Sequence, residues 1–565
     1  MEVTPSNLSF DVIIVGSGFT GLRIASNLVV DGRKIRSSDD DNDDDASIGR
    51  EQRWLSIAVL DTRGRVGGRT CSGALAINSN TSDNNRNNHI HNVSTGGTWI
   101  GRTHTRMLQL VKDVGMNVEK QYFPSSPHQN SNKDETNKFS RLVSLLSYEP
   151  HPLTVNEYHE LDMFIALIDD IVNIVDVSNI ENLPYATLYD SMTIEQYIQS
   201  RQDIVISVAV QIELLTFFET VLSCNIYECS FLFAVWYLAS SGGIEALGDN
   251  TSTSNQYYTL RDCTAGPVTI CNIIAGRLET DNGVTLLRNT TVSSIDYTDH
   301  NVLVIQATDA YDDCSNDSNN ANQSIMLTCQ RCVFAMNPAL AYTTIHFTPE
   351  LPPEKKQFNI LDGDKSNVLP GHAIKIYLSY KFPFWDDDDD DDHNNTVHGS
   401  NVKSSVNTNN LRLDEIYPAK NIFSSQKVNG HSTIVALITG KTCISVLGMM
   451  KSERKLLLLK QLCNMYPQVD TTIINTPVSY LETNWCTDKL LSGGCYTNGY
   501  KKFIGVRLAL QSPLGGNDNG YNDDDDGRIF FASSETADKY CGYMEGALVA
   551  GDAVSNKIIK SLNIY

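Results

Sequence analysis

The chain has 565 residues, which is too long for one simple core and long enough for two large domains or one elaborated architecture. Hydrophobic residues make up 41% of it and aromatic residues 8%, so a sizeable core can form and wholesale disorder is excluded. Acidic residues outnumber basic residues by 67 to 44, and the net charge of −23 argues against nucleic-acid binding, which needs a basic face.

Much of the negative charge lies in three aspartate runs, at Asp39–Asp45, Asp386–Asp392 and Asp523–Asp526. Without these 17 aspartates the net charge would be −6. We interpret the runs as solvated, self-repelling inserts, with an acidic docking surface as the alternative. Low-complexity inserts are expected near residues 33–53, 78–92, 125–137, 312–324, 386–410 and 515–527.

The first predicted element is a strand at Asp11–Val15, a short β-branched apolar run typical of a buried parallel strand. A glycine-rich turn and an apolar-periodic helix to about Val30 follow, and Leu55–Leu60 is a second such strand. Leu161–Ser240 is predicted to be mainly helical. Further strands are expected at 284–305, 325–335, 373–379 and 432–439, and a last helix at 546–562. This order predicts an α/β domain with an α+β partner domain.

The turn Gly16-Ser17-Gly18-Phe19-Thr20-Gly21 lies directly between the first strand and the first helix, the context that gives such a motif meaning. Gly16 turns the chain, Gly18 lets the backbone approach a pyrophosphate, and Gly21 packs the helix on the strand. The helix start offers free N–H groups and a positive dipole to phosphates. The motif predicts a Rossmann-like dinucleotide site, and a turn without a ligand is the alternative.

An acidic residue at the end of the second strand should bind the ribose hydroxyls of the dinucleotide, and Asp61 closes that strand. It lies 40 residues after Gly21, where about 20 are expected. The insert Arg33–Arg53 explains the excess.

Five ordered segments carry a resemblance to a known family. The first two are the arginine- and glycine-rich stretch Asp61–Thr70 and a second glycine turn, Gly96–Gly101. With them the sequence resembles the flavin amine oxidase superfamily, whose dinucleotide is FAD. Three later segments narrow the resemblance to the monoamine oxidases. They are His372-Ala373-Ile374-Lys375 with Pro383-Phe384-Trp385, Asn484-Trp485-Cys486 with Ser492-Gly493-Gly494-Cys495-Tyr496, and Glu535-Thr536-Ala537 with Gly542-Tyr543-Met544-Glu545-Gly546.

The resemblance runs from about Asp11 to Ile559 and implies a Rossmann-like FAD-binding domain, discontinuous in sequence, with an α+β substrate-binding domain. The FAD-binding domain is expected at residues 1–118, 263–335 and 489–565, and the substrate domain at 119–262 and 336–488.

The resemblance also assigns roles to single residues. It implies that Cys495 forms a thioether to the 8α carbon of FAD, and that Tyr496 and Tyr543 flank the amine in front of the flavin. Lys375 would hold a water at flavin N5, and Trp485 would pack beside the flavin. A solvent-facing Lys375 and a packing role for Trp485 are alternatives. Further implied FAD contacts are Gly16, Ser17, Gly18, Gly21, Asp61, Arg63, Gly68, Arg69, Val292 and Glu535.

Some positions depart from the family pattern. The usual glutamate after the second strand is Asp61 here, and Ser533-Ser534 replaces a Gly-Thr pair before Glu535, which could instead cap a helix start. Gln256 is a candidate for a glutamine of the family's substrate cavity. The residues that gate the cavity fall within 244–256 and 417–425 without single assignments.

The implied activity is oxidative deamination of a small amine with FAD and O2, giving an aldehyde, ammonia or a smaller amine, and hydrogen peroxide. One alternative is a polyamine or amino-acid oxidase with non-covalent FAD. An alternative of another class is a flavin-fold binding protein without turnover. A homodimer is one option for assembly, and no metal site is expected, because Cys329 and Cys332 have no second CxxC pair.

The ends of the chain lack targeting signals. Met1–Phe10 has neither a basic nor an apolar signal region, and the C-terminus is neither a hydrophobic tail nor a peroxisomal tripeptide. We therefore expect a cytoplasmic protein without a transmembrane anchor, in which the 13 cysteines form no disulfide framework.

Overall fold

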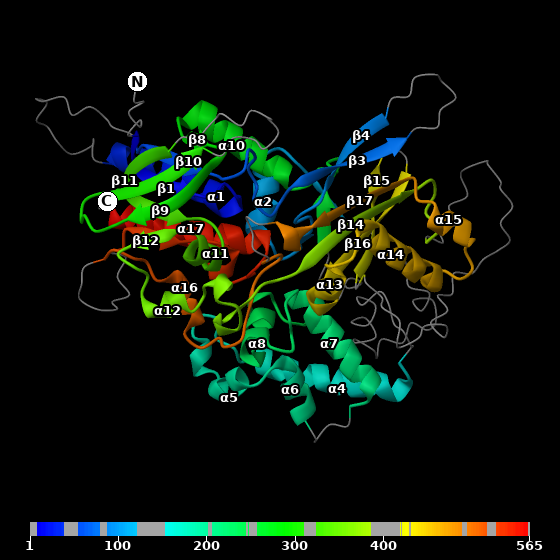
Figure 1. Ribbon diagram of the computed structural model, residues 1–565. Coiled ribbons are helices and arrows are strands. Elements are labelled where there is room, and N and C mark those ends of the chain that lie inside the picture. Colours follow the sequence, from blue (N-terminus) through cyan, green and yellow to red (C-terminus); the bar gives the residue numbers. More distant parts are fainter. Residues whose placement is uncertain are drawn as a thin grey trace, which may run out of the picture.

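The computed structural model describes residues 8–38, 55–78, 88–120, 153–201, 206–244, 247, 257–309, 324–385, 419, 421–428, 431–488, 494–516 and 527–562. Figure 1 shows two lobes side by side with a layer of helices below them. One lobe contains the first strand and the last helix, and the other is built on strands from the later half of the chain. The three aspartate runs lie outside the described residues.

An eight-stranded mixed sheet forms the core of the first lobe, in the order β12-β9-β10-β11-β1-β2-β8, with β19 also beside β11. The first part of β11 pairs antiparallel with β10, whereas its last part pairs parallel with β19, and β1 runs parallel along its other side. The strands are β1 (Leu8–Val15), β2 (Ile57–Leu60), β8 (Thr285–Leu287), β9 (Thr290–Asp296), β10 (Leu303–Asp309), β11 (Ser324–Phe334), β12 (His346–Thr348) and β19 (Ile529–Phe531).

Both faces of this sheet are covered, which explains the unbroken apolar run of β1. Val12 and Ile14 join one core cluster with residues of α1, α10 and α17, while Ile13 and Val15 face the other large core cluster. The helices on and around this lobe are α1 (Phe19–Ser38), α2 (Thr105–Asp113), α10 (Val268–Asn282), α11 (Pro338–Thr344), α12 (Pro353–Lys356), α16 (Val506–Gln511) and α17 (Met544–Ser561). The first lobe is therefore the Rossmann-like unit of an α/β fold, as the sequence predicts.

The second lobe is an antiparallel sheet in the order β15-β16-β14-β17. Every residue of β14 is buried, because helices cover one face of the sheet and the other face meets the β3–β4 hairpin and the first lobe. The elements are β14 (Ala373–Tyr380), β15 (Asn421–Val428), β16 (His431–Thr439), β17 (Ser479–Asn484), α13 (Gly440–Val446), α14 (Lys451–Met465), α15 (Thr471–Asn475), β3 (Ser72–Asn78) and β4 (Asn88–Ser94).

The helical layer contains α4 (Val155–Val172), α5 (Ala186–Ser191), α6 (Ile194–Ser200), α7 (Val208–Leu222) and α8 (Phe231–Ser240). Thr154 and Thr193 start α4 and α6 with capping boxes. Helix α8 is apolar on all sides and buried over nearly its whole length, which places it in the centre of this layer. The remaining short elements are β5 (Ile100–Gly101), β6 (Val118–Lys120), β7 (Tyr257–Leu260), β13 (Val368–Leu369), β18 (Gly499–Tyr500), η2 (Ile180–Asn182), η3 (Ile360–Lys365), η5 (Trp485–Thr487) and η6 (Ser534–Thr536).

Two predicted inserts contain regular structure at their edges. The loop expected over Asn78–Asn92 is wrong at its end, because Asn88–Asn92 belong to β4 and pair with β3. The many Asn and His residues of this segment do not indicate a strand. Its partner β3 supplies Leu75 to a small core. The first helix also continues beyond Val30 to Ser38, into the insert expected from residue 33.

The main sheet draws its strands from separate stretches of the chain. Strand β12 pairs with β9 in this sheet, although residues 336–488 were assigned to the substrate domain. The remaining domain bounds stay a prediction. Within the described part of the chain, no helix has the length and apolar character to cross a membrane, and no group of His, Cys, Asp or Glu side chains is arranged to hold a metal ion.

Candidate active site

A cavity of about 620 Å³ is lined by residues of both lobes and of the helical layer. This volume lies within the range of roughly 300–1,000 Å³ that small-molecule sites occupy. The turns after β1, β2 and β11 contribute to its lining, as do residues of α7, α8, β14 and β16. The segment Gly494–Tyr496 lies along the wall.

The three glycines of the first turn differ in whether the surrounding structure leaves room for a side chain. Gly16 has a φ of +112°, and a Cβ there would lie 2.6 Å from the carbonyl oxygen of Ala335. A Cβ on Gly21 would lie 1.9 Å from the carbonyl oxygen of Gly16, so this position must be bare for α1 to pack. A Cβ on Gly18, in contrast, would meet no atom within 4 Å. The fold does not require glycine at position 18, whereas a ligand that approaches the backbone would.

The first turn of α1 adds further backbone groups to the part of the cavity that the glycine turn lines. Phe19 and Thr20 line the cavity at the start of the helix, where backbone N–H groups lack helical partners. Such a helix start favours a phosphate or pyrophosphate. The residues at this end of the cavity therefore fit a dinucleotide.

Asp61 ties two loops together at the same end of the cavity. Its Oδ2 accepts hydrogen bonds from the backbone N (2.8 Å) and Oγ (2.6 Å) of Ser17, and its Oδ1 accepts one from the backbone N of Arg63 (2.9 Å). The Arg63 guanidinium pairs with both carboxylate oxygens of Asp488, at 2.9 and 2.8 Å. Ser17, Asp61, Arg63 and Val292 all line the cavity, as do Gly16, Gly18, Gly68 and Arg69.

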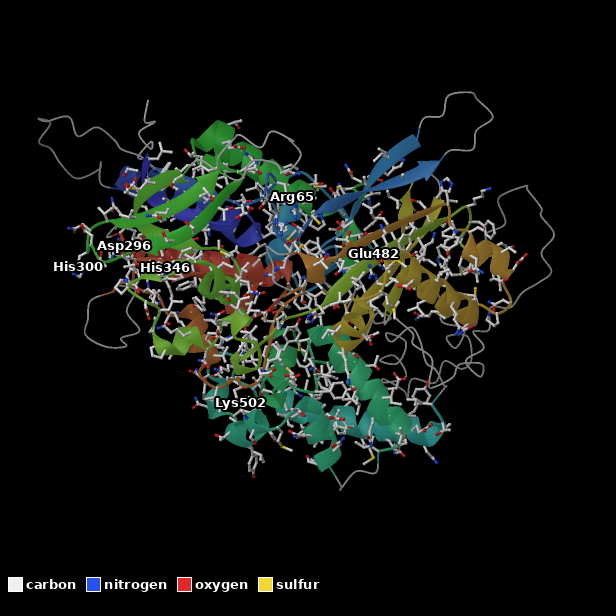
Figure 2. All side chains as sticks on the ribbon, viewed as in Figure 1. Arg65, Asp296, His300, His346, Glu482 and Lys502 are labelled. Atoms are coloured by element: carbon white, nitrogen blue, oxygen red, sulfur yellow. The ribbon has the colours of Figure 1, made fainter. Side chains whose placement is uncertain are left out.

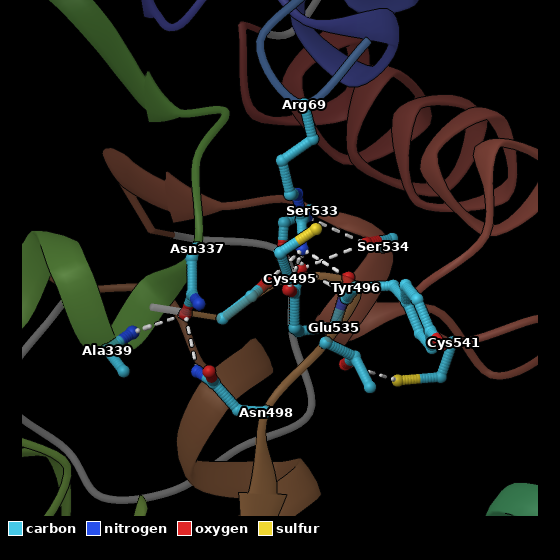
Figure 3. Close-up of polar contacts among 12 residues, drawn as sticks. Arg69, Asn337, Ala339, Cys495, Tyr496, Asn498, Ser533, Ser534, Glu535 and Cys541 are labelled. Atoms are coloured by element: carbon cyan, nitrogen blue, oxygen red, sulfur yellow. Dashed lines mark hydrogen bonds and ion pairs between the residues drawn. The ribbon is translucent and has the colours of Figure 1, made fainter. Parts of the chain in front are cut away.

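Arg69 connects the nucleotide end of the cavity to the segment that contains Cys495 (Figure 3). Its Nη1 donates to the carbonyl oxygens of Gly494 (3.0 Å) and Tyr496 (2.7 Å), which flank Cys495 on both sides. The same guanidinium pairs with Glu535 at 2.5 and 2.9 Å. Arg69 therefore fixes the backbone on either side of Cys495.

Glu535 is almost fully buried and is not among the residues that line the cavity, and neither is Gly21. Burial raises the pKa of Glu535, but the charge and hydrogen bonds of Arg69 and hydrogen bonds from Ser533 and Ser534 outweigh it and lower the pKa below its ordinary value. Glu535 therefore stays ionised and orients Arg69. The FAD contact expected of Glu535 stays a prediction, and the described contacts show its ion pair with Arg69.

Cys495 lies in the cavity wall and is 8% exposed. It packs against Ala373 and Trp485, and the Trp485 Nε1 donates to the carbonyl oxygen of Thr95 at 2.9 Å. The Oγ of Ser223 donates to the Cys495 carbonyl oxygen and accepts from the backbone N of Tyr496, both at 3.1 Å. Burial raises the pKa of the Cys495 thiol to about 12, although the charges of Arg69 and Lys375 oppose this effect.

Lys375 points from β14 into the cavity, while its neighbours Ile374 and Ile376 face the core under the sheet. Its Nζ donates to the carbonyl oxygen of Gly96 at 3.0 Å and to Oγ1 of Thr98 at 2.5 Å. Burial lowers the pKa of Lys375 to about 7. The alternative of a solvent-facing lysine is therefore wrong, and the amine can gain or lose a proton near neutral pH.

Tyr496 and Tyr543 both line the cavity, together with Tyr237 and Tyr257. The Tyr496 hydroxyl donates to the carbonyl oxygen of Thr220 at 2.9 Å, which holds its ring in place. Burial raises the pKa of Tyr496 and Tyr543 well above the ordinary value of 10.0, so both phenols stay neutral.

His104 supports Tyr543 from behind. Its ring lies edge-on to the Tyr543 ring with centroids 5.4 Å apart, and its Nδ1 accepts a hydrogen bond from the backbone N of Gly101 at 3.0 Å. Burial lowers the pKa of His104 to about 4, so the imidazole is neutral at physiological pH.

Several cavity residues escaped the sequence analysis. They come mainly from α7, α8 and the strands beside them, and they are Phe217, Thr220, Val221, Tyr237, Leu247, Tyr257 and Leu437. These helices are apolar on most sides, so their periodicity cannot separate a residue that lines a cavity from one that fills the core. Gln256 lies outside the described residues, as do most of the segments expected to gate the cavity.

The ionisable residues are unevenly distributed along the cavity. Among the described residues that line it, Asp61 is the only acid, and it lies at the glycine-turn end. Arg65 is labelled in Figure 2 near the junction of the lobes. Its guanidinium donates hydrogen bonds to carbonyl oxygens of its own loop, those of Val66, Gly68 and Thr70. The lining contributed by the tyrosines and by α7 and α8 is therefore mainly apolar and aromatic, and the basic residues Arg69 and Lys375 also line the cavity.

A family model described as "Flavin containing amine oxidoreductase" matches residues 21–559. Curated relatives include "Amine oxidase [flavin-containing] A" of Equus caballus, 23% identical, and "Amine oxidase [flavin-containing] B" of Mus musculus, 25% identical. The matches cover 98% of this chain and 85% and 86% of those proteins.

Two solved structures share the fold. Cyclohexylamine oxidase from Brevibacterium oxydans has a TM-score of 0.66 at 18% identity, over 98% of this chain and 99% of that chain. Wild-type putrescine oxidase bound to putrescine also has a TM-score of 0.66 at 18% identity, over 98% of this chain and 100% of that chain.

Proposed function

Because the chain belongs to the family of flavin containing amine oxidoreductases, whose cofactor is FAD, we propose that it is a monoamine oxidase with FAD bound covalently at Cys495. The observation that carries the proposal is the shared cavity. Its wall contains the glycine turn at Gly16–Gly18, Cys495, and the two tyrosines Tyr496 and Tyr543.

FAD, when bound, supplies an acceptor for two electrons and the α-hydrogen of the amine, and O2 restores it with release of hydrogen peroxide. The glycine turn and the start of α1 would hold the pyrophosphate, and Asp61 the ribose next to it. Val292 would place its backbone at the adenine. Cys495 would be joined through Sγ to the flavin ring, and Trp485 beside it would fix the position of that ring.

Tyr496 and Tyr543 would position the amine. Their neutral phenol rings attract an amine nitrogen and leave a narrow passage that favours unbranched amines. The apolar surroundings disfavour the ammonium form, so the substrate loses a proton before its α-carbon reacts. The resulting imine reacts with water to give an aldehyde and ammonia.

Lys375 would hold the water needed at this end of the cavity. Two acceptors, Gly96 and Thr98, already bind its Nζ, which fixes the nitrogen and leaves it one further hydrogen-bonding direction. With a pKa of about 7, the amine can exchange a proton with that water near neutral pH.

The charge distribution favours a monoamine over a diamine. A second ammonium group would need a carboxylate, and the described lining offers only Asp61, which already accepts hydrogen bonds from Ser17 and Arg63. The fold shared with a putrescine oxidase keeps a polyamine oxidase as the second candidate. An amino-acid substrate is disfavoured, because Arg63 and Arg69 are committed to Asp488 and to the Glu535 pair.

The test is peroxide release from the purified protein over a panel of amines. A benzylamine-type, an aryl-ethyl and a polyamine substrate are compared, each with catalase as a control. We expect kcat/KM to be highest for an aryl-alkyl monoamine. Preference for the polyamine would favour the second candidate, and the absence of both flavin reduction without oxygen and peroxide release would leave a binding protein without turnover.

A further inference from the structure

Two cysteines outside the cavity lining, one on α13 and one in the turn after β17, are in sulfur-to-sulfur contact. The Sγ of Cys443 on α13 lies 3.4 Å from the Sγ of Cys486 in η5. Cys443 is buried, whereas Cys486 is partly exposed. Cys486 is therefore the more exposed residue of the pair and the one that an oxidant from solvent would meet first.

We propose that Cys443 and Cys486 form a reversible disulfide when the protein meets hydrogen peroxide. The inference rests on the proposed function for the source of the peroxide, which turnover would release in the adjoining cavity. The chemistry itself needs only the two thiols and the oxidant.

The reaction is balanced in two steps. The Cys486 sulfur attacks one peroxide oxygen, the O–O bond breaks, and a sulfenic acid and one water form. The Cys443 sulfur then attacks the Cys486 sulfur, the S–O bond breaks, and a second water leaves with the thiol proton. Two thiols and one hydrogen peroxide give one disulfide and two waters, so the peroxide takes up the two electrons that the thiols lose.

The order of attack follows from burial and hydrogen bonding. Contact with Cys443 stabilises the thiolate of Cys486 and lowers the pKa of Cys486, while the same contact and burial raise the pKa of Cys443. A thiolate is the reactive form of cysteine, so the accessible sulfur is also the more nucleophilic one.

A second pair provides an internal comparison. Cys224 and Cys229 lie close together and are both fully buried, with their sulfurs packed over Gly499. An added Cβ on Gly499 would lie 2.5 Å from the Cys224 sulfur and 3.4 Å from the Cys229 sulfur. Peroxide cannot reach either sulfur from solvent, so this pair should stay reduced.

A disulfide bond at Cys486 should affect the cavity through Trp485, the preceding residue. Trp485 immediately precedes Cys486 in η5 and packs against Cys495, and the Cys486 sulfur also contacts the carbonyl oxygen of Ala373 at 3.8 Å. Drawing the sulfurs together therefore shifts the turn that holds Trp485. We expect turnover to fall by roughly tenfold, since displacements of about 1 Å at an active site can cost up to 10²-fold.

The experiment maps thiols in the holoenzyme. The protein is reduced, desalted, treated with hydrogen peroxide, quenched with catalase and alkylated, and peptides are then identified by mass spectrometry without reduction. The expected result is a linked Cys443–Cys486 peptide, alkylated Cys224 and Cys229, and amine turnover that falls and returns with a thiol reductant.

Cys443→Ser is the matched variant, with Cys443→Ala as a second in case serine disturbs the buried site. Either should keep the basal activity and lose both the linked peptide and the recovery by reductant. Alkylation of both Cys443 and Cys486 after peroxide treatment, or a link between Cys224 and Cys229 in their place, would overturn the inference.

The two proposals fail separately in this design, because the peroxide is added from outside. A missing link in a protein that oxidises amines removes the disulfide and leaves the proposed function intact. A link in a protein that oxidises no amine supports the disulfide and contradicts the proposed function.

Discussion

Three charged side chains at or beside the cavity have partners that fix their direction. Asp61 accepts three hydrogen bonds, Glu535 is neutralised by Arg69, and Lys375 has two oxygen acceptors. An ion without such partners would be too costly to bury. The side chains that the proposed chemistry needs are therefore held in place before any ligand binds.

At Lys375 we predict an effect of pH. In Lys375→Met, kcat should fall by roughly 10²-fold or more, and the rise of kcat through about pH 7 in the wild type should disappear, because Nζ can accept a proton only above its pKa. Steady-state peroxide assays from pH 5 to 9 measure both effects. Lys356→Met is the control, since Lys356 pairs with Glu350 in an exposed position. An unchanged pH profile in Lys375→Met would rule out this role.

At Glu535 we predict a loss of flavin attachment. Glu535→Gln leaves Arg69 without its counter-charge, so the carbonyl groups on either side of Cys495 lose their fixed position. Covalent incorporation of FAD should slow by roughly 10²-fold. Flavin fluorescence of the denatured protein on a gel follows this rate.

The control is Glu482→Gln, which breaks the buried ion pair with Arg454 in the second lobe, where Figure 2 labels Glu482. Both variants should lower the melting temperature, but Glu535→Gln alone should slow attachment. Equal incorporation in the two variants would show that the Arg69 contact is only structural.

Sequence matching located most of the candidate site but not the way its parts support one another. It named Cys495, Lys375 and the two tyrosines because each lies in a motif with specific neighbours. It could not show that Glu535 acts through Arg69, because a contact over 466 positions of sequence leaves no local pattern. It also missed Tyr237, which looks like any other aromatic residue in an apolar helix.

At the scale of single elements, the C-terminal end of α16 contacts the buried side chain of Lys355. The Nζ of Lys355 donates to the carbonyl oxygens of Ala509 (2.6 Å) and Ser512 (2.8 Å) and to the hydroxyl of Tyr342 (3.1 Å). Its nitrogen also lies 4.6 Å from the centre of the Phe531 ring on β19. Lys355 therefore joins the end of this helix to the main sheet.

Lys355→Met should lower the free energy of unfolding by about 1–3 kcal/mol, because two buried carbonyl groups lose their donor. Burial lowers the pKa of Lys355 to about 7 from the ordinary 10.5, so the unfolded chain binds the extra proton between these values. The contribution of Lys355 is thus smallest below pH 7 and grows as the pH rises to 10.5.

Denaturant unfolding at pH 7 and pH 9 measures the difference between Lys355→Met and the wild type, which should be larger at pH 9. Lys356→Met, one residue along the same short helix, should change the free energy of unfolding by less than about 1 kcal/mol. A larger difference at pH 7 than at pH 9 would contradict this account of Lys355.

Elements were predictable where one face, or both, is buried in a regular pattern. Strand β1 could be predicted from its unbroken β-branched apolar run, and the final helix from apolar residues that follow a helical period. Strand β4 could not, since four of the five residues of Asn88–Asn92 are Asn or His and the pairing of the strand depends on β3, from which the chain is separated by an insert. The long inserts add to this difficulty by separating partners that pair directly in the sheet.

For the whole molecule, the two lobes are fastened to each other around the cavity. Lys375 reaches Gly96 and Thr98, Trp485 reaches Thr95, and further contacts run from Arg63 to Asp488 and from Arg69 to Gly494 and Tyr496. These contacts join stretches that lie hundreds of residues apart. The cavity therefore depends on the complete fold and should be lost when the lobes separate.

The stability of the whole protein should fall in mild acid because of His104. Burial lowers its pKa to about 4 from the ordinary 6.5, so the unfolded chain binds a proton that the folded protein excludes between these values. Stability is lost as the pH falls through this window, by up to about 3 kcal/mol. His104→Gln should reduce the pH dependence, as followed by melting temperature from pH 7 to 4.

His346→Gln is the matched control, because His346 lies exposed on the outer edge of the first lobe (Figure 2). It should leave the pH dependence unchanged. A similar slope in His104→Gln and the wild type would mean that other groups cause the loss of stability in acid.

The most direct measurement is the mass of the peptide that contains Cys495, taken from the purified holoenzyme after acid denaturation and digestion. The account predicts that this peptide carries FAD less two hydrogens, with a flavin absorbance that remains with it, and that Cys495→Ala yields neither. An unmodified Cys495 peptide, with all flavin free in the acid supernatant of the wild type, would contradict the covalent link at the centre of the proposed site.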